Sequence, residues 1–243
     1  MRRRTIGEIL TILIVALSVG VLVTRRRRSE TSTAITPVQP RPQSPLSSDD
    51  SSQLGRFTVA VVGDSIIHMS VSQIRDALEG PCGVAVRAHP GAKLGDIDAL
   101  TDSLLREDAG RLPDAMAITL GTNDVTGRTA EWLEHWTTLM KRVLVVPRVI
   151  LFTINRHADE LGKRCLEGPT ASNINEAIAL AGEAENVVVV DWDAAVQADV
   201  ELVWDRREHR GDFVHPSVKG QRWIAEQVRA ALPDWWSKDR RGR

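Results

Sequence analysis

Short apolar runs rich in β-branched residues alternate along this chain with segments whose apolar residues recur every three or four positions. Runs of the first kind are typical of strands buried on both faces, and segments of the second kind are typical of amphipathic helices. Their alternation predicts an α/β fold with a parallel sheet. The predicted strands are 57–62, 84–88, 114–120, 149–154 and 187–190.

Helices are predicted between these strands and after the last of them. After the first strand, Ile67, Val71, Ile74 and Leu78 have helical spacing, and Gly80-Pro81 then ends the helix. The other predicted helices are one with Ile97, Leu100 and Leu104, one from about 129 to 144, one with Ile174, Ile178 and Ala181, and one from about 217 to 232.

Residues 1–24 combine a basic start with an apolar run that has no charge from Ile9 to Val23. A membrane-spanning helix usually takes about 20 residues, a length that Thr5 to Thr24 would reach. No small-x-small cleavage site precedes Arg25, so we expect an uncleaved signal anchor, with a cleaved signal peptide as the alternative. Arginines flank both ends of the run, so the positive-inside rule does not fix its orientation.

The chain is expected to have four parts. The signal anchor at 1–24 is followed by a linker at 25–55, which is rich in Ser, Thr, Pro and Arg and is too poor in apolar residues to fold. The folded domain is expected at 56–237 and a basic tail at 238–243. We therefore expect a single-pass, membrane-anchored protein whose domain is extracytoplasmic.

Composition excludes some partners and pairings. The net charge of −1 gives no support to nucleic-acid binding, which needs clustered basic surface. Cys82 precedes the second strand and Cys165 follows the fourth, so they belong at opposite ends of the sheet. A strand separates those ends by about 17–20 Å, beyond the roughly 7 Å that a disulfide allows between Cα atoms. We predict two unlinked thiols.

Three short polar segments directly follow predicted strands. They are Gly63-Asp64-Ser65, Pro90-Gly91 and Gly121-Thr122-Asn123-Asp124, and a fourth segment, Asp212-Phe213-Val214-His215, precedes the last helix. In a parallel sheet, ligands bind beyond the carboxyl ends of the strands. The strand assignment alone therefore predicts that the first three segments gather at one edge.

The four segments hold the parts of an acyl-transfer site. Ser65 is a candidate nucleophile, His215 a candidate base, and Asp212 a carboxylate that can orient the imidazole. Gly91 and Asn123 are candidate donors to the oxyanion of the intermediate. The alternatives are a helix N-cap for Ser65, an ordinary surface pair for Asp212 and His215, and turn chemistry for the two glycine segments.

These four segments, in this order, resemble the motif blocks of the SGNH hydrolase family, also called GDSL esterases and lipases. The resemblance implies a three-layer α/β/α sandwich with a five-stranded parallel sheet, flavodoxin-like in its arrangement. It implies a Ser65, His215 and Asp212 triad, with an oxyanion hole from the N–H groups of Ser65 and Gly91 and the side chain of Asn123. It implies no metal or organic cofactor. Gly95 is a second candidate for the glycine of the second block.

The expected activity is that of a serine esterase that works through an acyl-enzyme. The alternatives are an O-acyltransferase on envelope carbohydrate with the same site, and a non-catalytic envelope binding protein on the same fold. The expected substrate is an acyl ester, either a lipid or an O-acylated carbohydrate. Trp204, in the loop before Asp212, is a candidate for lining the acyl or alcohol pocket. His89 and His157 fall in loops on the same face, where either could contact substrate, although we interpret both as ordinary polar residues exposed to solvent.

Overall fold

The computed structural model describes residues 57–78, 82–107, 111–159, 168–204 and 212–233. All of them belong to one compact unit, Arg56–Arg243. The predicted anchor at 1–24, the linker at 25–55 and the tail at 238–243 lie outside the described residues and stay predictions. Within the described ranges, no helix combines the length and the apolar character needed to cross a membrane.

The described strands form one parallel five-stranded sheet in the order β2-β1-β3-β4-β5. They are β1 (Phe57–Gly63), β2 (Cys82–Ala88), β3 (Ala115–Ile118), β4 (Val149–Phe152) and β5 (Val187–Val190). The parallel sheet is confirmed. The predicted strands extend two residues beyond the ends of β3 and β4, because Thr119-Leu120 and Thr153-Ile154 continue the strand-like runs after the last paired residue.

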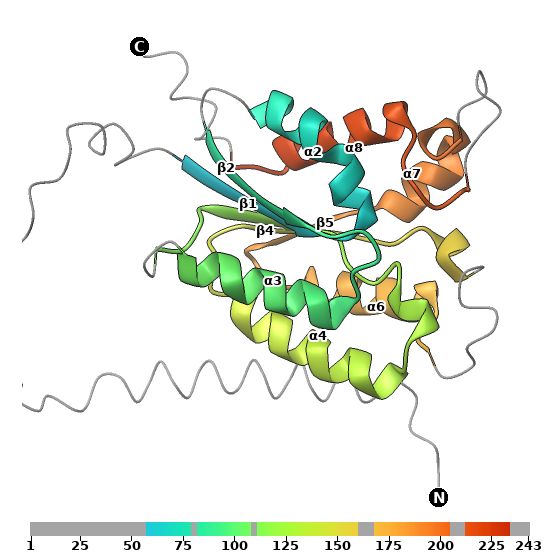
Figure 1. The fold of residues 1–243 in the computed structure, drawn as a ribbon, viewed down its shortest axis with the longest axis horizontal. Coiled ribbons are helices and arrows are strands. Elements are labelled where there is room, and N and C mark those ends of the chain that lie inside the picture. Colours follow the sequence, from blue (N-terminus) through green and yellow to red (C-terminus); the bar gives the residue numbers. More distant parts are fainter. Residues whose placement is uncertain (1–56, 79–81, 108–110, 160–167, 205–211, 234–243) are drawn as a thin grey trace, which may run out of the picture. The chain divides into compact units, whose positions relative to one another are not determined.

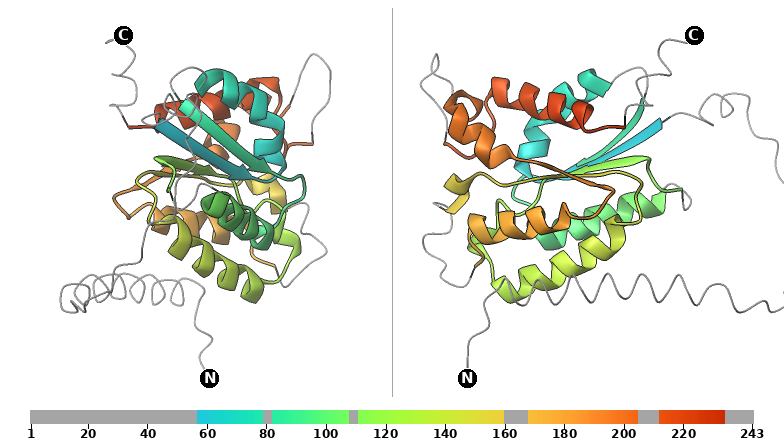
Figure 2. Two further views of the ribbon diagram at one scale, coloured as in Figure 1. Left: turned by 60° about the vertical axis from the view of Figure 1, so that its left-hand side comes forward. Right: turned by 180° about the vertical axis from the view of Figure 1, so that it is seen from behind.

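Helices cover both faces of the sheet and make three layers, as predicted (Figures 1 and 2). One face carries α2 (Ser65–Leu78), α7 (Trp192–Ala198) and α8 (Val218–Ala230). The other face carries α3 (Leu94–Glu107), α4 (Thr129–Val143) and α6 (Ala171–Ala181). Helix α7 was not predicted from the pattern, because its seven residues span too few turns to show a helical period.

The apolar stripe of α2 makes one side of the core. Ile67, Ile74 and Leu78 are fully buried, and they belong to the same cluster as Ile224 and Val228 of α8. Burial of these stripes holds α2 and α8 against the sheet. The start of α2 is therefore fixed relative to the segment that leads into α8.

The strand order brings the predicted motif segments together. Because β1 lies between β2 and β3, the segment that follows β1 is flanked by those that follow β2 and β3. Gly63, the last residue of β1, sits where an added Cβ would lie 2.4 Å from both Ile67 Cγ1 and Thr119 Oγ1. Only glycine lets the chain turn this closely between the sheet and α2.

Cys82 is buried at the start of β2, at the amino end of the sheet, as the pattern predicts. Cys165 lies outside the described residues. The absence of a Cys82–Cys165 disulfide therefore stays a prediction.

Candidate active site

Ser65 is the first residue of α2, and the preceding Asp64 takes the capping position. Asp64 Oδ1 accepts the Ile66 N–H at 3.0 Å, and the Asp64 carbonyl accepts the His68 N–H at 3.0 Å. The structure thus gives the N-cap role to Asp64 and not to Ser65. The Ser65 hydroxyl is left to interact elsewhere.

Asp64 is fully buried and ties the turn to the neighbouring strand. Its Oδ1 also accepts the Thr119 hydroxyl at 3.1 Å, so the carboxylate links the start of α2 to the end of β3. Burial raises the pKa of Asp64, while hydrogen bonds from Ile66, Thr122 and Thr119 oppose that rise. These contacts give Asp64 a structural part in the turn that leads into α2.

Ser65, His215 and Asp212 form a chain of two hydrogen bonds. His215 Nε2 lies 2.9 Å from Ser65 Oγ, and His215 Nδ1 lies 2.5 Å from Asp212 Oδ2. A carboxylate can only accept, so Nδ1 donates to it, and in the neutral imidazole Nε2 then has a lone pair toward the serine hydroxyl. The fold thus brings together residues that are 150 positions apart in the sequence.

The segment around Asp212 is folded on its own carboxylate. Oδ1 of Asp212 accepts the N–H groups of Val214 at 2.9 Å and His215 at 2.8 Å, while Oδ2 faces the imidazole. Partial burial works to raise the pKa of Asp212, but the hydrogen bonds from His215 and Val214 outweigh it and hold the pKa below its ordinary value. Asp212 is therefore charged at neutral pH.

The two candidate glycines of the second block have different surroundings. Gly91 lies in the loop after β2 with φ +79°, and an added Cβ would meet nothing within 4 Å. Glycine is favoured there by conformation and not by space. Gly95 lies inside α3, where an added Cβ would come within 2.9 Å of His135 Nε2. Gly91, and not Gly95, is in the loop beside the start of α2.

Two adjacent side chains of the third motif segment form hydrogen bonds with the backbone just after Gly91. Asn123 Nδ2 donates to the Ala92 carbonyl at 3.0 Å, and the Asp124 carboxylate accepts the Leu94 N–H at 3.1 and 3.0 Å. A side-chain amide has two donor hydrogens, so Asn123 keeps a second one for a ligand. Burial raises the pKa of Asp124 to about 6, against the lowering effect of the Leu94 hydrogen bond.

Phe213 is a feature of the site that the sequence analysis did not single out. It has φ +63°, a conformation favoured by glycine, and among the described residues it is the only non-glycine with positive φ. Its carbonyl accepts the Asn155 side-chain amide at 2.6 Å. Its ring stacks on Trp204 and lies near His157. The sequence did not predict these contacts, although Trp204 was already a candidate for lining a pocket.

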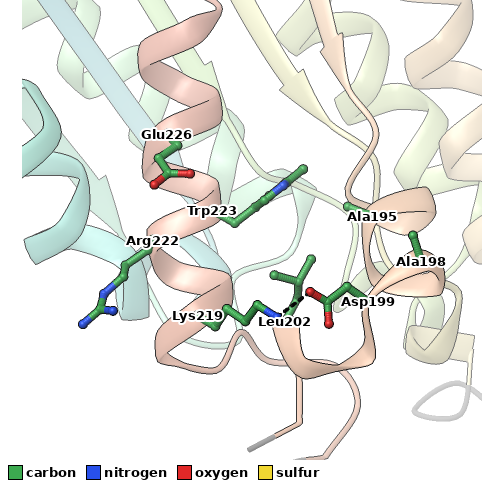
Figure 3. A pocket seen from close by; sticks show the side chains of 8 residues that line it. All are labelled: Ala195, Ala198, Asp199, Leu202, Lys219, Arg222, Trp223 and Glu226. Carbon is green, nitrogen blue, oxygen red and sulfur yellow. Dashed lines mark ion pairs between the residues drawn. The ribbon is translucent and has the colours of Figure 1, made fainter.

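Within the described ranges, no three His, Cys, Asp or Glu side chains gather in a way that could hold a metal ion. A pocket of about 410 Å³ lies between α7, η4 (Val200–Leu202) and α8 (Figure 3), and neither Ser65 nor His215 is among the residues that line it. Lys219 in this pocket is paired with Asp199 at 2.6 Å and with Glu201 at 3.0 Å. Trp223 forms part of its wall.

Solved structures with the same fold are numerous. A lipase/acylhydrolase from Enterococcus faecalis is similar at 19% identity and TM-score 0.53, over 72% of this chain and 94% of the other. The catalytic domain of Streptococcus pneumoniae peptidoglycan O-acetyltransferase A is similar at 20% identity and TM-score 0.52, over 73% and 92%. An acetyl xylan esterase is similar at 17% identity and TM-score 0.55, over 73% and 100%.

At these identities the structural likeness shows the fold alone. No curated protein matches the sequence at a significant level. The profile of the GDSL-like lipase/acylhydrolase family matches residues 61–223, which include all four motif segments and most of the described residues. The chain therefore belongs to the GDSL-like lipase/acylhydrolase family.

Proposed function

We propose that this protein is a serine esterase that cleaves carboxylic esters through an acyl-enzyme carried on Ser65. The observation that supports this most strongly is the hydrogen-bonded chain from Ser65 through His215 to Asp212, at 2.9 and 2.5 Å. A serine hydroxyl is a weak nucleophile until an adjacent base accepts its proton. A binding protein would gain nothing from this alignment.

In the first step, Ser65 Oγ bonds to the carbonyl carbon of the ester as its proton moves to His215 Nε2. Asp212, held charged by its hydrogen bonds, stabilises the imidazolium that results. The carbonyl oxygen becomes negative, and its proposed donors are the N–H groups of Ser65 and Gly91 with the free amide hydrogen of Asn123. Such fixed donors are often the largest single contribution to catalysis.

In the second step, the bond between the carbonyl carbon and the alcohol oxygen breaks. The alcohol leaves with the proton from His215 Nε2, and the acyl group stays on Ser65.

In the deacylation step, water gives a proton to Nε2 and attacks the acyl carbon. The bond between the acyl carbon and Ser65 Oγ breaks, the acid departs, and Oγ takes the proton back from Nε2. Each acyl transfer thus uses the same base and the same oxyanion donors.

An O-acyltransferase is the second candidate. Its chemistry differs only in the last acceptor, which would be a sugar hydroxyl in place of water. The side chains of His215 and Asp212 are 37% and 55% exposed, so an acceptor larger than water could approach the base. The fold likeness to a peptidoglycan O-acetyltransferase is compatible with this alternative.

The proposal is tested on the full chain with fluorophosphonate labelling and p-nitrophenyl acetate turnover. Wild type is compared with Ser65→Ala and with Ser72→Ala, which removes an exposed hydroxyl from the same helix. We expect labelling and turnover in wild type and Ser72→Ala and neither in Ser65→Ala. A folded wild-type protein that is not labelled would rule out an activated serine and favour the binding protein.

A sugar acceptor added to the same assay separates the two enzymatic candidates. A hydrolase releases acetate at a rate that the acceptor does not change. A transferase forms an acetylated sugar and releases less acetate. The two products are measured in one reaction by mass spectrometry.

A further inference from the structure

Three rings from different segments form a cluster at the loop that carries His215. We call Trp204, Phe213 and His157 the aromatic cluster. The Trp204 and Phe213 rings are stacked, with centroids 4.9 Å apart and planes at 11°. The His157 ring lies 5.7 Å from Phe213 at 41°. Phe213 is 40% exposed, so the cluster offers apolar ring surface to solvent within two residues of the candidate base.

The backbone of Phe213 has an unfavourable, left-handed conformation. A bulky residue at φ +63° is strained, and such strain persists only where the surroundings impose it. Here the buried Asn155 binds the Phe213 carbonyl at 2.6 Å, and Asp212 binds the next two N–H groups. Glycine would fit this backbone without strain. A large ring at this position indicates that the ring itself has a role.

The chemistry of the proposed reaction says which part of a substrate meets the cluster. His215 must give its proton to the leaving alcohol, so the alcohol oxygen lies beside the imidazole. The carbonyl oxygen lies instead toward Gly91 and Asn123, which follow β2 and β3. His157 follows β4, and Phe213 is on the His215 loop. The aromatic cluster therefore borders the alcohol side of the ester and not the carbonyl oxygen.

The neighbourhood of the cluster is polar as well as aromatic. Next to His157, the Arg156 guanidinium forms a two-point pair with the Asp193 carboxylate, in which Nε donates to Oδ1 at 3.2 Å and Nη2 donates to Oδ2 at 2.8 Å. Both groups are planar and carry hydrogen-bonding atoms. Flat apolar rings beside planar polar groups suit a ligand that has one apolar face and a polar rim.

We propose that the aromatic cluster is the subsite for the alcohol part of the ester, and that it selects ring alcohols with a flat apolar face, of which an acetylated pyranose is the favoured case. This inference rests on the proposed esterase activity. An aryl alcohol shares the flat face but lacks the polar rim, so both ring classes are compared. Selection acts on acylation, because the acyl-enzyme no longer holds the alcohol.

The test uses the full chain and three acetate esters that differ only in the alcohol: ethyl acetate, phenyl acetate and methyl 6-O-acetyl-glucopyranoside. The variants are Trp204→Leu and Phe213→Leu. The control is Trp223→Leu, which removes the same side chain from the pocket between α7 and α8 (Figure 3). For each ester, kcat/KM of the variant is divided by that of wild type, which cancels the intrinsic reactivity of the ester.

We expect Trp204→Leu and Phe213→Leu to lower kcat/KM for the pyranoside about tenfold more than for ethyl acetate, as loss of an aromatic contact predicts. A similar loss for phenyl acetate assigns the selection to the flat face alone, and a smaller loss assigns it to the sugar. Trp223→Leu should change kcat/KM by the same factor for all three esters. An equal fall for all three esters in the cluster variants would overturn the proposal, because the rings would then only support the His215 loop.

Failure of the proposed activity gives a different result. Wild type would then turn over none of the three esters, and Ser65 would not react with a fluorophosphonate. Turnover of all three esters with unchanged ratios in every variant would overturn the subsite and leave the esterase intact.

Discussion

Both oxygens of the Asp124 carboxylate accept the backbone N–H of Leu94, at 3.1 and 3.0 Å. Leu94 opens α3, so this contact fixes the end of the loop that contains Gly91. Asn123, one residue earlier, binds the Ala92 carbonyl in the same loop. The third motif segment therefore positions the second, in addition to any direct part in binding an oxyanion.

The buried Asp124 gives folding a distinct pH dependence. Its pKa rises from 3.8 to about 6 because of burial, so the folded state binds this proton more tightly than the unfolded state does. The resulting stability is complete below pH 3.8 and is lost as the pH rises through about 6. A shift of about two units corresponds to about 3 kcal/mol.

We therefore expect the free energy of unfolding of wild type, relative to Asp124→Asn, to fall by about 3 kcal/mol between about pH 4 and pH 7. Urea unfolding at a series of pH values measures this difference. Asp96→Asn is the control, since Asp96 is exposed and accepts the Lys93 N–H at the same end of α3. A difference that does not change with pH would show that Asp124 is not buried as described.

Asn123→Ala should lower the rate of acylation by about 10² to 10³, the usual effect of removing one oxyanion donor. It should also cost about 1 kcal/mol of stability, because the Ala92 carbonyl loses its partner. Single-turnover kinetics and thermal unfolding separate the two effects. If activity fell less than fivefold, the second amide hydrogen of Asn123 would have no part in the reaction.

The strain at Phe213 predicts a reversal of the usual order of alanine and glycine. Both Phe213→Ala and Phe213→Gly remove the ring, but only glycine relaxes at φ +63°. We expect Phe213→Gly to be more stable than Phe213→Ala by about 1 kcal/mol, from the cost of a left-handed conformation. Denaturant unfolding of the pair measures this. The ordinary order, with alanine the more stable, would contradict the described backbone.

Two alanine substitutions distinguish the candidate glycines of the second block. Gly91→Ala meets no steric barrier but must hold φ +79°, so we expect a loss of about 1–2 kcal/mol and a shifted loop with lower activity. Gly95→Ala is helical and displaces only the His135 ring, so we expect activity within about twofold of wild type. Turnover of p-nitrophenyl acetate measures the activity of the two variants, and thermal unfolding measures their stability. The opposite pattern would assign the role to Gly95.

The sheet was predictable because its strands are apolar runs, of which β3 and β4 are buried along their whole length. Ala115–Ile118 and Val187–Val190 consist of apolar residues alone, and such runs stand out between amphipathic helices. The position of Ser65 followed from the end of β1. Helix α7 was missed because a seven-residue helix directly after a strand shows no period.

The contacts within the site were less predictable than its members. The spacing of Asp212 and His215 suggested that they meet, but only the family resemblance placed their loop against Ser65, 150 residues away. The strained backbone of Phe213 and its support by Asn155 depend on tertiary packing. The hydrogen bond from the Leu94 N–H to Asp124 also joins residues that are 30 positions apart. The sequence around Asp124 showed only residues typical of a turn.

The most direct test asks where the acyl group sits during turnover. The full chain is mixed with p-nitrophenyl acetate, denatured by acid before the steady state, digested and mapped by mass spectrometry. Our account predicts an acetyl group on Ser65, and none on the corresponding peptide of Ser65→Ala. Acetylation of a different residue, or continued turnover by Ser65→Ala at the wild-type rate, would contradict it.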